Sequence, residues 1–437
     1  MGIQFVMPLR AACAATLTTL IAVGLASAAP GHLDPTFSGD GWARTRDFFG
    51  YFQEYMPKGA EDVAIQHDGK IVATGELESG YESYFGAFRY TANGDLDRGF
   101  GEGGWVDTDV GSVEHPHAVA IQGDGKIVLA GSGFFNVTPC TVIVRYQVSG
   151  ELDRSFGGNG IVRTCRRNSP GAEDVLVQPD GKIVTVSAHH HYRPFHDFTL
   201  FLVARYLPDG RQDRTFSGDG TAEIGLRAGQ YPRAALLQRD AKILVAGSGG
   251  QYSSTTSDFV LARLNRNGTP DRSFSGDGLR TVDIRGRVDG ASALAVQRNG
   301  RIVVAGTTGI SRYPWDPRIA VVRLLRNGAV DRTFGKRVLK PAANGGNARA
   351  VVVQPDGGIL VAGRAYDDRK QDTSAWALVR YLPNGRVDRS FGKGGIVLGD
   401  FGTGADWAGA MVLQPDGKIV VAGSVYEDQA VARFLPR

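Results

Sequence analysis

The stretch RYLPDGRQDRTF at residues 205–216 decides the fold, because the two ends of the chain carry separate parts of it. Residues 433–437 (RFLPR) match its beginning, and residues 31–37 (GHLDPTF) match its remainder. Joined head to tail, the two ends rebuild one complete copy of a repeated unit. Such a pattern is expected when a ring of repeats is closed by pairing its first and last segments, so the sequence predicts a circular architecture.

Two motifs alternate along the chain, and each occurs seven times. The first, Gln-x-Asp-Gly-Lys-Ile, begins at Gln66, Gln122, Gln178, Gln238, Gln297, Gln354 and Gln414, at intervals of 56 to 60 residues. The second, Leu-Asp-x-x-Phe followed by glycines, has its aspartates at Asp34, Asp97, Asp153, Asp213, Asp271, Asp331 and Asp388. A fixed period of this length indicates a repeat architecture rather than several independent domains.

Each unit is interpreted as one small antiparallel sheet, as the second unit illustrates. Three apolar runs of strand length, at 117–122, 126–131 and 141–146, are followed by a short fourth at 161–164. Gly-Asp-Gly separates the first two runs, and glycine and aspartate favour tight turns. The first two runs are apolar at nearly every position, which indicates strands that are buried on both faces.

These features predict an all-β, seven-bladed β-propeller with four antiparallel strands per blade. We expect residues 29–437 to form this single domain from seven repeats of about 58 residues. The N-terminal strand, at about 41–45, is expected to pair with the C-terminal blade and close the ring. An open solenoid would instead need polar caps at its ends, and the sequence shows none.

The QPDGKIVVAG and LDRSFGxGG signatures closely resemble the delta-60 repeat of bacterial exported proteins, a propeller-type repeat. The resemblance covers essentially all of residues 31–437, with Ala241, Gly358 and Pro270 as small departures from the motifs. It implies a fold and export, but no settled activity, so it supplies no catalytic residues.

The first 28 residues resemble a secretory signal. Arg10 precedes an apolar stretch from Ala11 to Gly24, which is too short to span a bilayer well, and Ala26-Ser27-Ala28 offers a cleavage site. The alternative is an uncleaved N-terminal anchor. We therefore expect a secreted, periplasmic or cell-surface protein with no membrane contact after cleavage.

The 49 basic and 45 acidic residues nearly balance, so no nucleic-acid partner is expected. We expect a monomer.

Two cysteines, Cys140 and Cys165, remain after removal of the signal. They lie near the ends of two strands that should be antiparallel neighbours, which predicts a cross-strand disulfide in an exported protein. The alternative is two free thiols.

An arginine recurs eight residues before the motif aspartate in each repeat, and we expect the two to form a structural ion pair. The pairs are Arg89–Asp97, Arg145–Asp153, Arg205–Asp213, Arg263–Asp271, Arg323–Asp331, Arg380–Asp388 and, across the closure, Arg433–Asp34. A guanidinium can grip a carboxylate with two hydrogen bonds. Seven equivalent ligand sites are the rival interpretation. The recurring motif phenylalanine is expected to fill the space between adjacent blades.

The loops that vary most between repeats share one end of the propeller, so a binding site is predicted there. The first residue of each innermost strand should line the mouth of the central channel, namely Glu61, His117, Glu173, Arg233, Ser292, Arg349 and Gly409. Asp62 and Asp174 follow two of them. This mixed-charge ring suits a small polar or zwitterionic ligand, or a divalent cation on its acidic side. The alternative is a mouth filled only with water.

Two further groups in the variable loops are candidates for binding. His189 and His191, with His196, are weak candidates for metal ligands because histidine is a common ligand. Trp407, with Trp315 and Trp376, could expose an indole to a sugar ring or a protein. The alternatives are a solvated loop for the histidines and indoles that cover the end of the channel.

The sequence contains no recognisable catalytic motif: G-x-S-x-G, H-E-x-x-H, Walker and C-x-x-C patterns are all absent. We therefore predict an exported, non-catalytic binding module for a protein, glycan or small polar ligand, without a cofactor. The alternative is a propeller enzyme, such as a metal-assisted hydrolase or lactonase, whose acidic channel residues hold a divalent cation.

Overall fold

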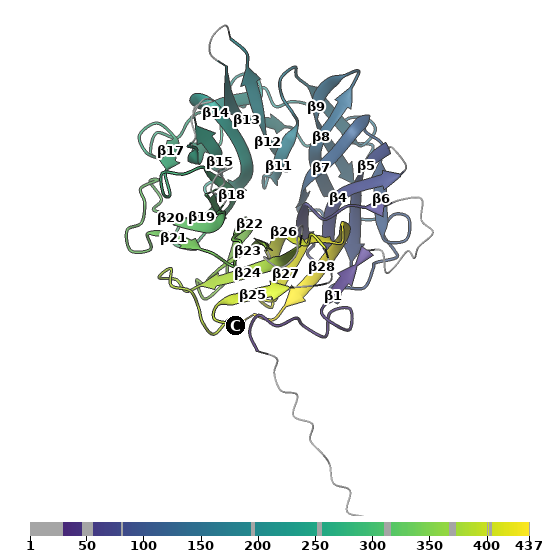
Figure 1. Ribbon diagram of the computed structural model, residues 1–437. Helices are drawn as coiled ribbons and strands as arrows, with labels where there is room; N and C mark the ends of the chain where they lie inside the picture. The colour runs from purple at the N-terminus through teal and green to yellow at the C-terminus, as the bar shows by residue number, and fades with distance from the viewer. Residues whose placement is uncertain are drawn as a thin grey trace, which may run out of the picture.

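The repeated unit folds into an antiparallel sheet, and the sheets are arranged around a common centre (Figure 1). The computed structural model describes residues 29–45, 56–79, 82–193, 197–250, 256–309, 316–366, 373–399, 401 and 404–436. The predicted signal, residues 1–28, lies outside the described residues. Within the described residues, no helix is long and apolar enough to cross a membrane.

The strands, in chain order, are β1 (Trp42–Arg44), β2 (Met56–Pro57), β3 (Asp62–Ile65), β4 (Ile71–Ser79), β5 (Glu82–Tyr90), β6 (Trp105–Thr108), β7 (Ser112–Ile121), β8 (Ile127–Phe135), β9 (Thr138–Tyr146), β10 (Ile161–Cys165), β11 (Ala172–Val177), β12 (Ile183–His191), β13 (Phe198–Tyr206), β14 (Thr221–Leu237), β15 (Ile243–Gly250), β16 (Asp258–Leu264), β17 (Leu279–Val282), β18 (Asp289–Val296), β19 (Ile302–Thr308), β20 (Arg318–Leu324), β21 (Lys336–Leu339), β22 (Gly346–Val353), β23 (Ile359–Tyr366), β24 (Ser374–Tyr381), β25 (Ile396–Gly399), β26 (Trp407–Leu413), β27 (Ile419–Val425) and β28 (Asp428–Phe434).

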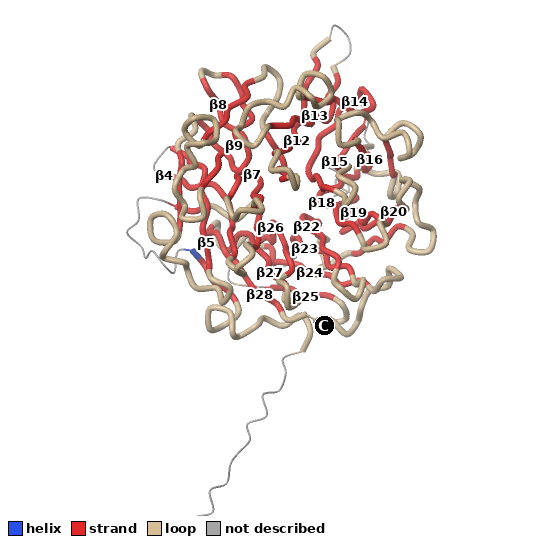
Figure 2. The backbone as a smooth tube through the Cα atoms, turned by 180° about the vertical axis from the view of Figure 1, so that it is seen from behind, coloured by secondary structure: helices blue, strands red, loops and turns tan. Residues whose placement is uncertain are grey.

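Closure follows the predicted route and completes a seven-bladed β-propeller. The last sheet has the order β1-β28-β27-β26, so its outermost strand comes from the N-terminal part of the chain. Trp42 pairs with Ala432 and Arg44 with Ala430 in an antiparallel register. Figure 1 shows β1 beside β28, close to the C-terminus. The innermost strand of each blade faces the centre, as β7, β18, β22 and β26 show in Figure 2.

Two blades depart from the four-strand pattern. β14 is long enough to serve as the outer strand of blade three and the inner strand of blade four, which fuses the two blades into a seven-stranded sheet. In blade one, β2 adds to the extended β4 through Met56 and Glu78.

The apolar core is divided into seven clusters, and each cluster combines side chains from two consecutive blades. The pairing includes blades seven and one, where Val431 and Val420 pack with Val63 and Ala73. This explains why the inner strands are apolar on both faces: each sheet packs against a neighbour on either side. Burial of one such side chain contributes roughly 1.5–3 kcal/mol, so the ring is held mainly by contacts between blades.

The motif arginine, aspartate and phenylalanine form one buried unit at each blade interface. In blade three, Arg205 Nε donates to Asp213 Oδ2 at 2.8 Å, and the guanidinium lies 4.7 Å from the centre of the Phe216 ring. Its Nη1 donates to the carbonyl oxygen of Arg266 in blade four. The Phe216 ring also packs against Gly268 of blade four, where an added Cβ would come within 3.0 Å of the ring. The arginine therefore joins its own blade to the next one.

Six of the seven arginines share this geometry, and blade six is the exception. There Gly358 replaces the motif lysine, and Arg380 turns to meet Gln354 Oε1 at 2.6 Å and Asp356 Oδ2 at 2.5 Å while still contacting Asp388. In the other blades the motif lysine, or Arg301, lies beside the aspartate; Lys182, for example, is 3.0 Å from Asp213.

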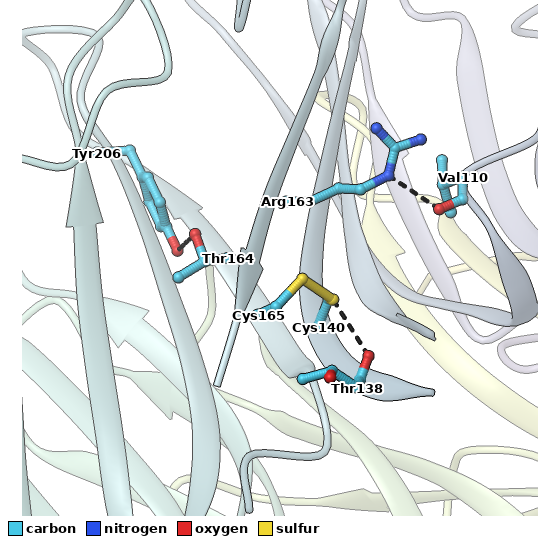
Figure 3. Close-up of a disulfide and its surroundings, with 7 residues drawn as sticks. All are labelled: Val110, Thr138, Cys140, Arg163, Thr164, Cys165 and Tyr206. Atoms are coloured by element: carbon cyan, nitrogen blue, oxygen red, sulfur yellow. Dashed lines mark hydrogen bonds between the residues drawn. A yellow bond between two sulfur atoms is a disulfide. The ribbon is translucent and has the colours of Figure 1, made fainter. Parts of the chain in front are cut away.

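The predicted disulfide between Cys140 and Cys165 is present (Figure 3). The two residues lie directly opposite each other on β9 and β10. Cys165 is the last residue of β10 rather than the residue after the strand, because the pairing continues one residue beyond the predicted end. The bond ties the outermost strand of blade two to its neighbour.

Candidate functional site

All seven residues predicted to line the channel mouth meet around one cavity of about 290 Å³. We call this set the channel ring: Glu61, His117, Glu173, Arg233, Ser292, Arg349 and Gly409. Each residue comes from a different blade.

The reason that these positions face the channel differs from the one predicted. They are not the first residues of their strands; β7, for example, already begins at Ser112 and β18 at Asp289. Six of the seven are instead the extra, unpaired residue of a β-bulge, as His117 is between Pro116 and Ala118. A bulge redirects one side chain without ending the strand, so each blade can present a different group to the channel.

The charges of the channel ring are arranged as two ion pairs. Arg233 Nη1 lies 2.9 Å from Glu173 Oε2, between neighbouring blades. Arg349 Nη1 lies 3.6 Å from Glu61 Oε2, although blade seven separates their blades. The Arg233 and Arg349 side chains remain 61% and 42% exposed, so both pairs are open to solvent and contribute little to stability.

The long reach from Arg349 to Glu61 depends on blade seven. Gly409 has no side chain to obstruct it, and a Cβ there would come within 2.6 Å of the Trp407 ring. The Arg349 guanidinium lies 4.4 Å from the centre of that ring, within the range of a cation–π contact. Trp407 is therefore half-buried in β26 as a platform for Arg349, rather than a loop indole that is free to stack on a sugar.

The other two tryptophans named from the sequence have different outcomes. Trp376 lies in β24 and is fully buried, and its Nε1 donates to the Ser424 carbonyl at 2.9 Å. The expectation of an exposed loop indole was wrong for Trp376, because the strand extends further than the apolar pattern indicated. Trp315 lies outside the described residues.

Two further carboxyl groups, Asp62 and Asp174, line a cavity together with the residues of the channel ring. Asp62 Oδ2 accepts a hydrogen bond from the backbone N–H of Val119, and Asp174 Oδ2 accepts one from Ala235. Each aspartate thus links its own inner strand to that of the next blade. Burial raises the pKa of Asp62 to about 6, and burial together with the charge of Asp62 raises the pKa of Asp174 to about 7.

The two histidines on the acidic side of the channel have opposite electrostatic environments. Burial lowers the pKa of His117, a member of the ring, although Glu173 and Glu61 oppose this effect. His115 faces outward to Glu76, whose carboxylate lies 3.0 Å from its Nδ1 and raises its pKa.

A buried polar position at the entry to the inner strand was missed in the sequence. It is occupied by Glu114, Gln230, Asp289 and Asp406 in four blades, each 0% exposed. Glu114 accepts hydrogen bonds from the backbone N–H groups of Val110 and Phe85, and burial raises its pKa to about 7. A polar residue recurs three positions before the channel-ring residue in these four blades, and this spacing could have revealed the position. The pattern was missed because the type of polar residue differs from blade to blade.

Two groups among the described residues bring three metal-ligating side chains within 4.8 Å of one another, and neither belongs to the channel ring. One group is His189, His191 and Glu223, and the other is Asp258, Asp283 and Asp289. Burial and the neighbouring Asp283 charge raise the pKa of Asp258, while Lys336 lies close enough to oppose that effect.

The histidines named from the sequence lie on a strand rather than in a loop. His189, His190 and His191 are the last three residues of β12. Their partner Glu223 on β14 was not identified in the sequence, because more than thirty residues and a whole strand separate it from the histidines. His196 lies outside the described residues.

The repeats match the family model described as "Domain of unknown function (DUF5122) beta-propeller", at residues 66–100, 122–156, 178–216, 238–274, 297–334, 354–391 and 414–436. The chain belongs to this β-propeller family. A search of curated proteins found no match.

Solved structures of other propellers resemble the chain at low sequence identity. Sqt1 from Chaetomium thermophilum has a TM-score of 0.48 and 13% identity, over 87% of this chain and 97% of Sqt1. An α-L-arabinanase from Penicillium chrysogenum has a TM-score of 0.43 and 11% identity, over 88% of this chain and 96% of the enzyme. A gluconolactonase from Xanthomonas campestris has a TM-score of 0.34 and 12% identity, over 71% and 90%. Likenesses at this level concern architecture alone.

Proposed function

We propose that this protein is an exported binding module that takes a small zwitterionic ligand at the channel ring. The observation that carries the proposal is the pair of solvent-open ion pairs, Glu173–Arg233 and Glu61–Arg349, around one cavity. Each supplies a carboxylate and a guanidinium. A ligand with an ammonium and a carboxylate group could replace the internal partner of either pair with its own charges.

The nature of the ring positions supports a binding role. The scaffold residues of the motifs recur in every blade, whereas the bulged ring position carries acidic, basic, hydroxyl, imidazole and no side chain in turn. Binding sites on repeat scaffolds are commonly built from such variable, loop-proximal positions, so this variation supports a recognition surface. Arg233 and Arg349 offer forked donors that match a ligand carboxylate.

Export is supported by the sequence features of residues 1–28, by the resemblance to the delta-60 repeat and by the Cys140–Cys165 disulfide, which suits an oxidising compartment. A protein or glycan partner on the same variable face remains the broader form of the proposal. We expect a monomer without a cofactor.

Enzymatic activity is the second candidate, and the environment of Asp62 and Asp174 favours it. Carboxyl groups with pKa values of about 6 and 7 that line a cavity can exchange protons near neutral pH. A divalent cation on the acidic side would make this candidate a metal-assisted hydrolase or lactonase. Both aspartates, however, already accept backbone hydrogen bonds from the next blade, which gives them a structural role.

A thermal-shift screen of amino acids, betaines and matched uncharged amides tests the proposal. We expect a zwitterion to raise the unfolding temperature of the wild type, and Arg233→Gln or Glu173→Gln to weaken its affinity by about tenfold or more, which corresponds to about 1.4 kcal/mol. Ser292→Ala is the matched control in the same ring. Equal responses to the amides, or loss of binding only in Asp174→Asn, would count against a zwitterion site.

A further inference from the structure

A cluster of two histidines and one glutamate lies on blade three, separate from the channel ring. His189 and His191 are two residues apart on β12, so their side chains leave the same face of the sheet. Their ring centres are 4.5 Å apart. His190, between them, points to the other face, where its Nδ1 lies 2.9 Å from Thr199 Oγ1.

Glu223 joins the two histidines from the outer strand of the same blade. β12 pairs with β13 through His189 and Leu200, and β13 pairs in turn with β14 through Leu202 and Glu223. The carboxylate thus reaches across β13. One oxygen, Oε1, lies 2.5 Å from His189 Nδ1, and the other, Oε2, lies 3.0 Å from His191 Nε2.

We propose that His189, His191 and Glu223 form a binding site for a divalent transition metal, with zinc as the best fit. One ligand atom from each residue lies within 4.8 Å of the others. In a zinc site the metal is about 2.0–2.2 Å from nitrogen and oxygen ligands, so small side-chain rotations would place one ion between them. Two imidazoles and a carboxylate also match the donor types that zinc prefers over calcium or magnesium.

The surroundings of the cluster favour a site that is both held in place and accessible. The His191 ring stacks on Phe198 with 4.6 Å between ring centres, which limits its rotation. The three side chains are 17%, 21% and 32% exposed, so an ion can reach them from solvent. Three protein ligands leave a fourth position for water or a ligand atom.

The metal would connect the end of the β12–β13 hairpin to β14. β12, β13 and β14 are neighbours in one sheet, so the ion would add a cross-link between the end of the hairpin and the strand shared by blades three and four. Without metal, the same residues form a hydrogen-bonded cluster in which Glu223 contacts both rings. The two states make different predictions for metal uptake.

Zinc binding by untagged protein tests the proposal, because an affinity tag would itself bind zinc. After treatment with EDTA and dialysis, the wild type titrated with ZnCl₂ in a calorimeter should bind one ion per chain and unfold at a higher temperature. His189→Ala, His191→Ala and Glu223→Gln should each weaken binding more than the roughly 10–100-fold that loss of an outer-shell partner causes. Substitution with Co²⁺ should give visible absorption bands in the wild type and lose them in these variants.

His190→Ala is the matched control, because it removes a neighbouring imidazole that faces away from the cluster. Its zinc affinity should equal that of the wild type. The unfolding temperature of each variant in EDTA shows whether it folds, and a folded variant without binding supports the site. Absence of zinc binding in the wild type, unchanged affinity in His189→Ala and Glu223→Gln, or equal loss in His190→Ala would overturn the proposal.

Discussion

At the scale of the residue, the Arg–Asp pair shows how a repeat motif holds a ring together. Arg205 and Asp213 are 4% and 2% exposed and also contact Thr215, Lys182 and a carbonyl of the next blade. Burial works against ionisation of Asp213, but hydrogen bonds from Thr215 and Lys182 and the charge of Arg205 lower its pKa overall. A charge held this firmly has a structural role.

Asp213→Ala should strongly destabilise the protein, because it leaves the buried Arg205 without its carboxylate. Breaking a buried pair in this way costs about 3–5 kcal/mol. Urea unfolding of the wild type and the variant measures the difference. Asp209→Ala is the control, because Asp209 pairs with Arg211 on the surface, with 45% and 78% of the two side chains exposed; that change should stay within about 0.5 kcal/mol. A similar decrease in the free energy of unfolding in the two variants would show that the buried pair stabilises the protein no more than the exposed pair does.

Individual site residues differed in how far the sequence could predict them. The channel ring was found because its residues occupy equivalent positions in a strict repeat. Glu223 could not be found, because its contact with His189 depends on a side chain reaching across β13. Trp376 was misassigned because its burial depends on Ser424 of the next blade, which accepts the indole hydrogen bond.

At the scale of the element, β-bulges in the inner strands determine which side chains face the channel. A regular strand would point alternate residues into the neighbouring blades, and the bulge is what frees one residue per blade for the channel. Apolar runs and the turn residues of the Gln-x-Asp-Gly motif predicted most strands. The bulges left no signal within one repeat, because the residues on either side of them are small and apolar in most blades, as Ala291 and Ala293 are.

The disulfide is the covalent support of β10, an outer strand that pairs with only one neighbour. Replacing both cysteines in Cys140→Ala/Cys165→Ala should reduce the free energy of unfolding by about 3 kcal/mol, because the bond closes a 25-residue separation in the unfolded chain. Denaturant unfolding measures this, and thiol titration of the unfolded wild type lacking residues 1–28 should find no free cysteine before reduction. Two reactive thiols in that titration would contradict the bond.

At the scale of the whole molecule, ionisable groups divide by position. Near the outer turns, hydrogen bonds from Thr36 and Lys418 and the charge of Arg433 overcome burial and lower the pKa of Asp34 to about 2. Burial raises the pKa of Asp62 and Asp174, which line the channel, and of Glu114, which lies between blades one and two, to about 6 or 7. The folded state therefore favours the ionised form of the motif aspartate Asp34 and the protonated forms of Asp62, Asp174 and Glu114.

Stability should be greatest near pH 4–5 and should fall as the pH rises from about 5 to about 7. In that range the folded protein holds protons on Asp62, Asp174 and Glu114 that the unfolded chain, with ordinary pKa values of 3.8 and 4.5, has released. Below about pH 4 stability is lost again, because Asp34 and its equivalents must take up protons as the pH approaches 2. Thermal unfolding between pH 3 and 8 measures the profile.

Asp174→Asn and Glu114→Gln should flatten the decline between pH 5 and 7, since each removes one group that titrates in that range. Asp209→Asn, an exposed substitution, should leave the decline between pH 5 and 7 unchanged, because the backbone N–H and the side chain of Arg211 lower the pKa of Asp209 and keep it ionised in that range. Stability that stays level or increases between pH 5 and 7 in the wild type would refute the assignment of these buried carboxyl groups.

The overall arrangement of the propeller could be predicted from the sequence, but the joining of blades three and four through one strand could not. Seven copies of a motif and two complementary ends were enough to predict the number of blades and the closing strand. The fusion of blades three and four was not predictable, because residues 221–237 carry both strand patterns and other connections between blades, such as residues 109–111, equally lack a Pro-Gly or Asp-Gly break.

Because the first half of β14 pairs with β13 and its second half with β15, one continuous strand joins blades three and four, and we expect this sector to be stiffer than the other blades. Local openings that expose backbone amides should begin at an edge strand that pairs with a single neighbour, such as β1 where the ring closes. Blades three and four should open last, and both at the same time. The backbone amides of β13 and β15 should then exchange slowly and with equal protection. Blades three and four would open as one cooperative unit, whereas the other five blades would open separately.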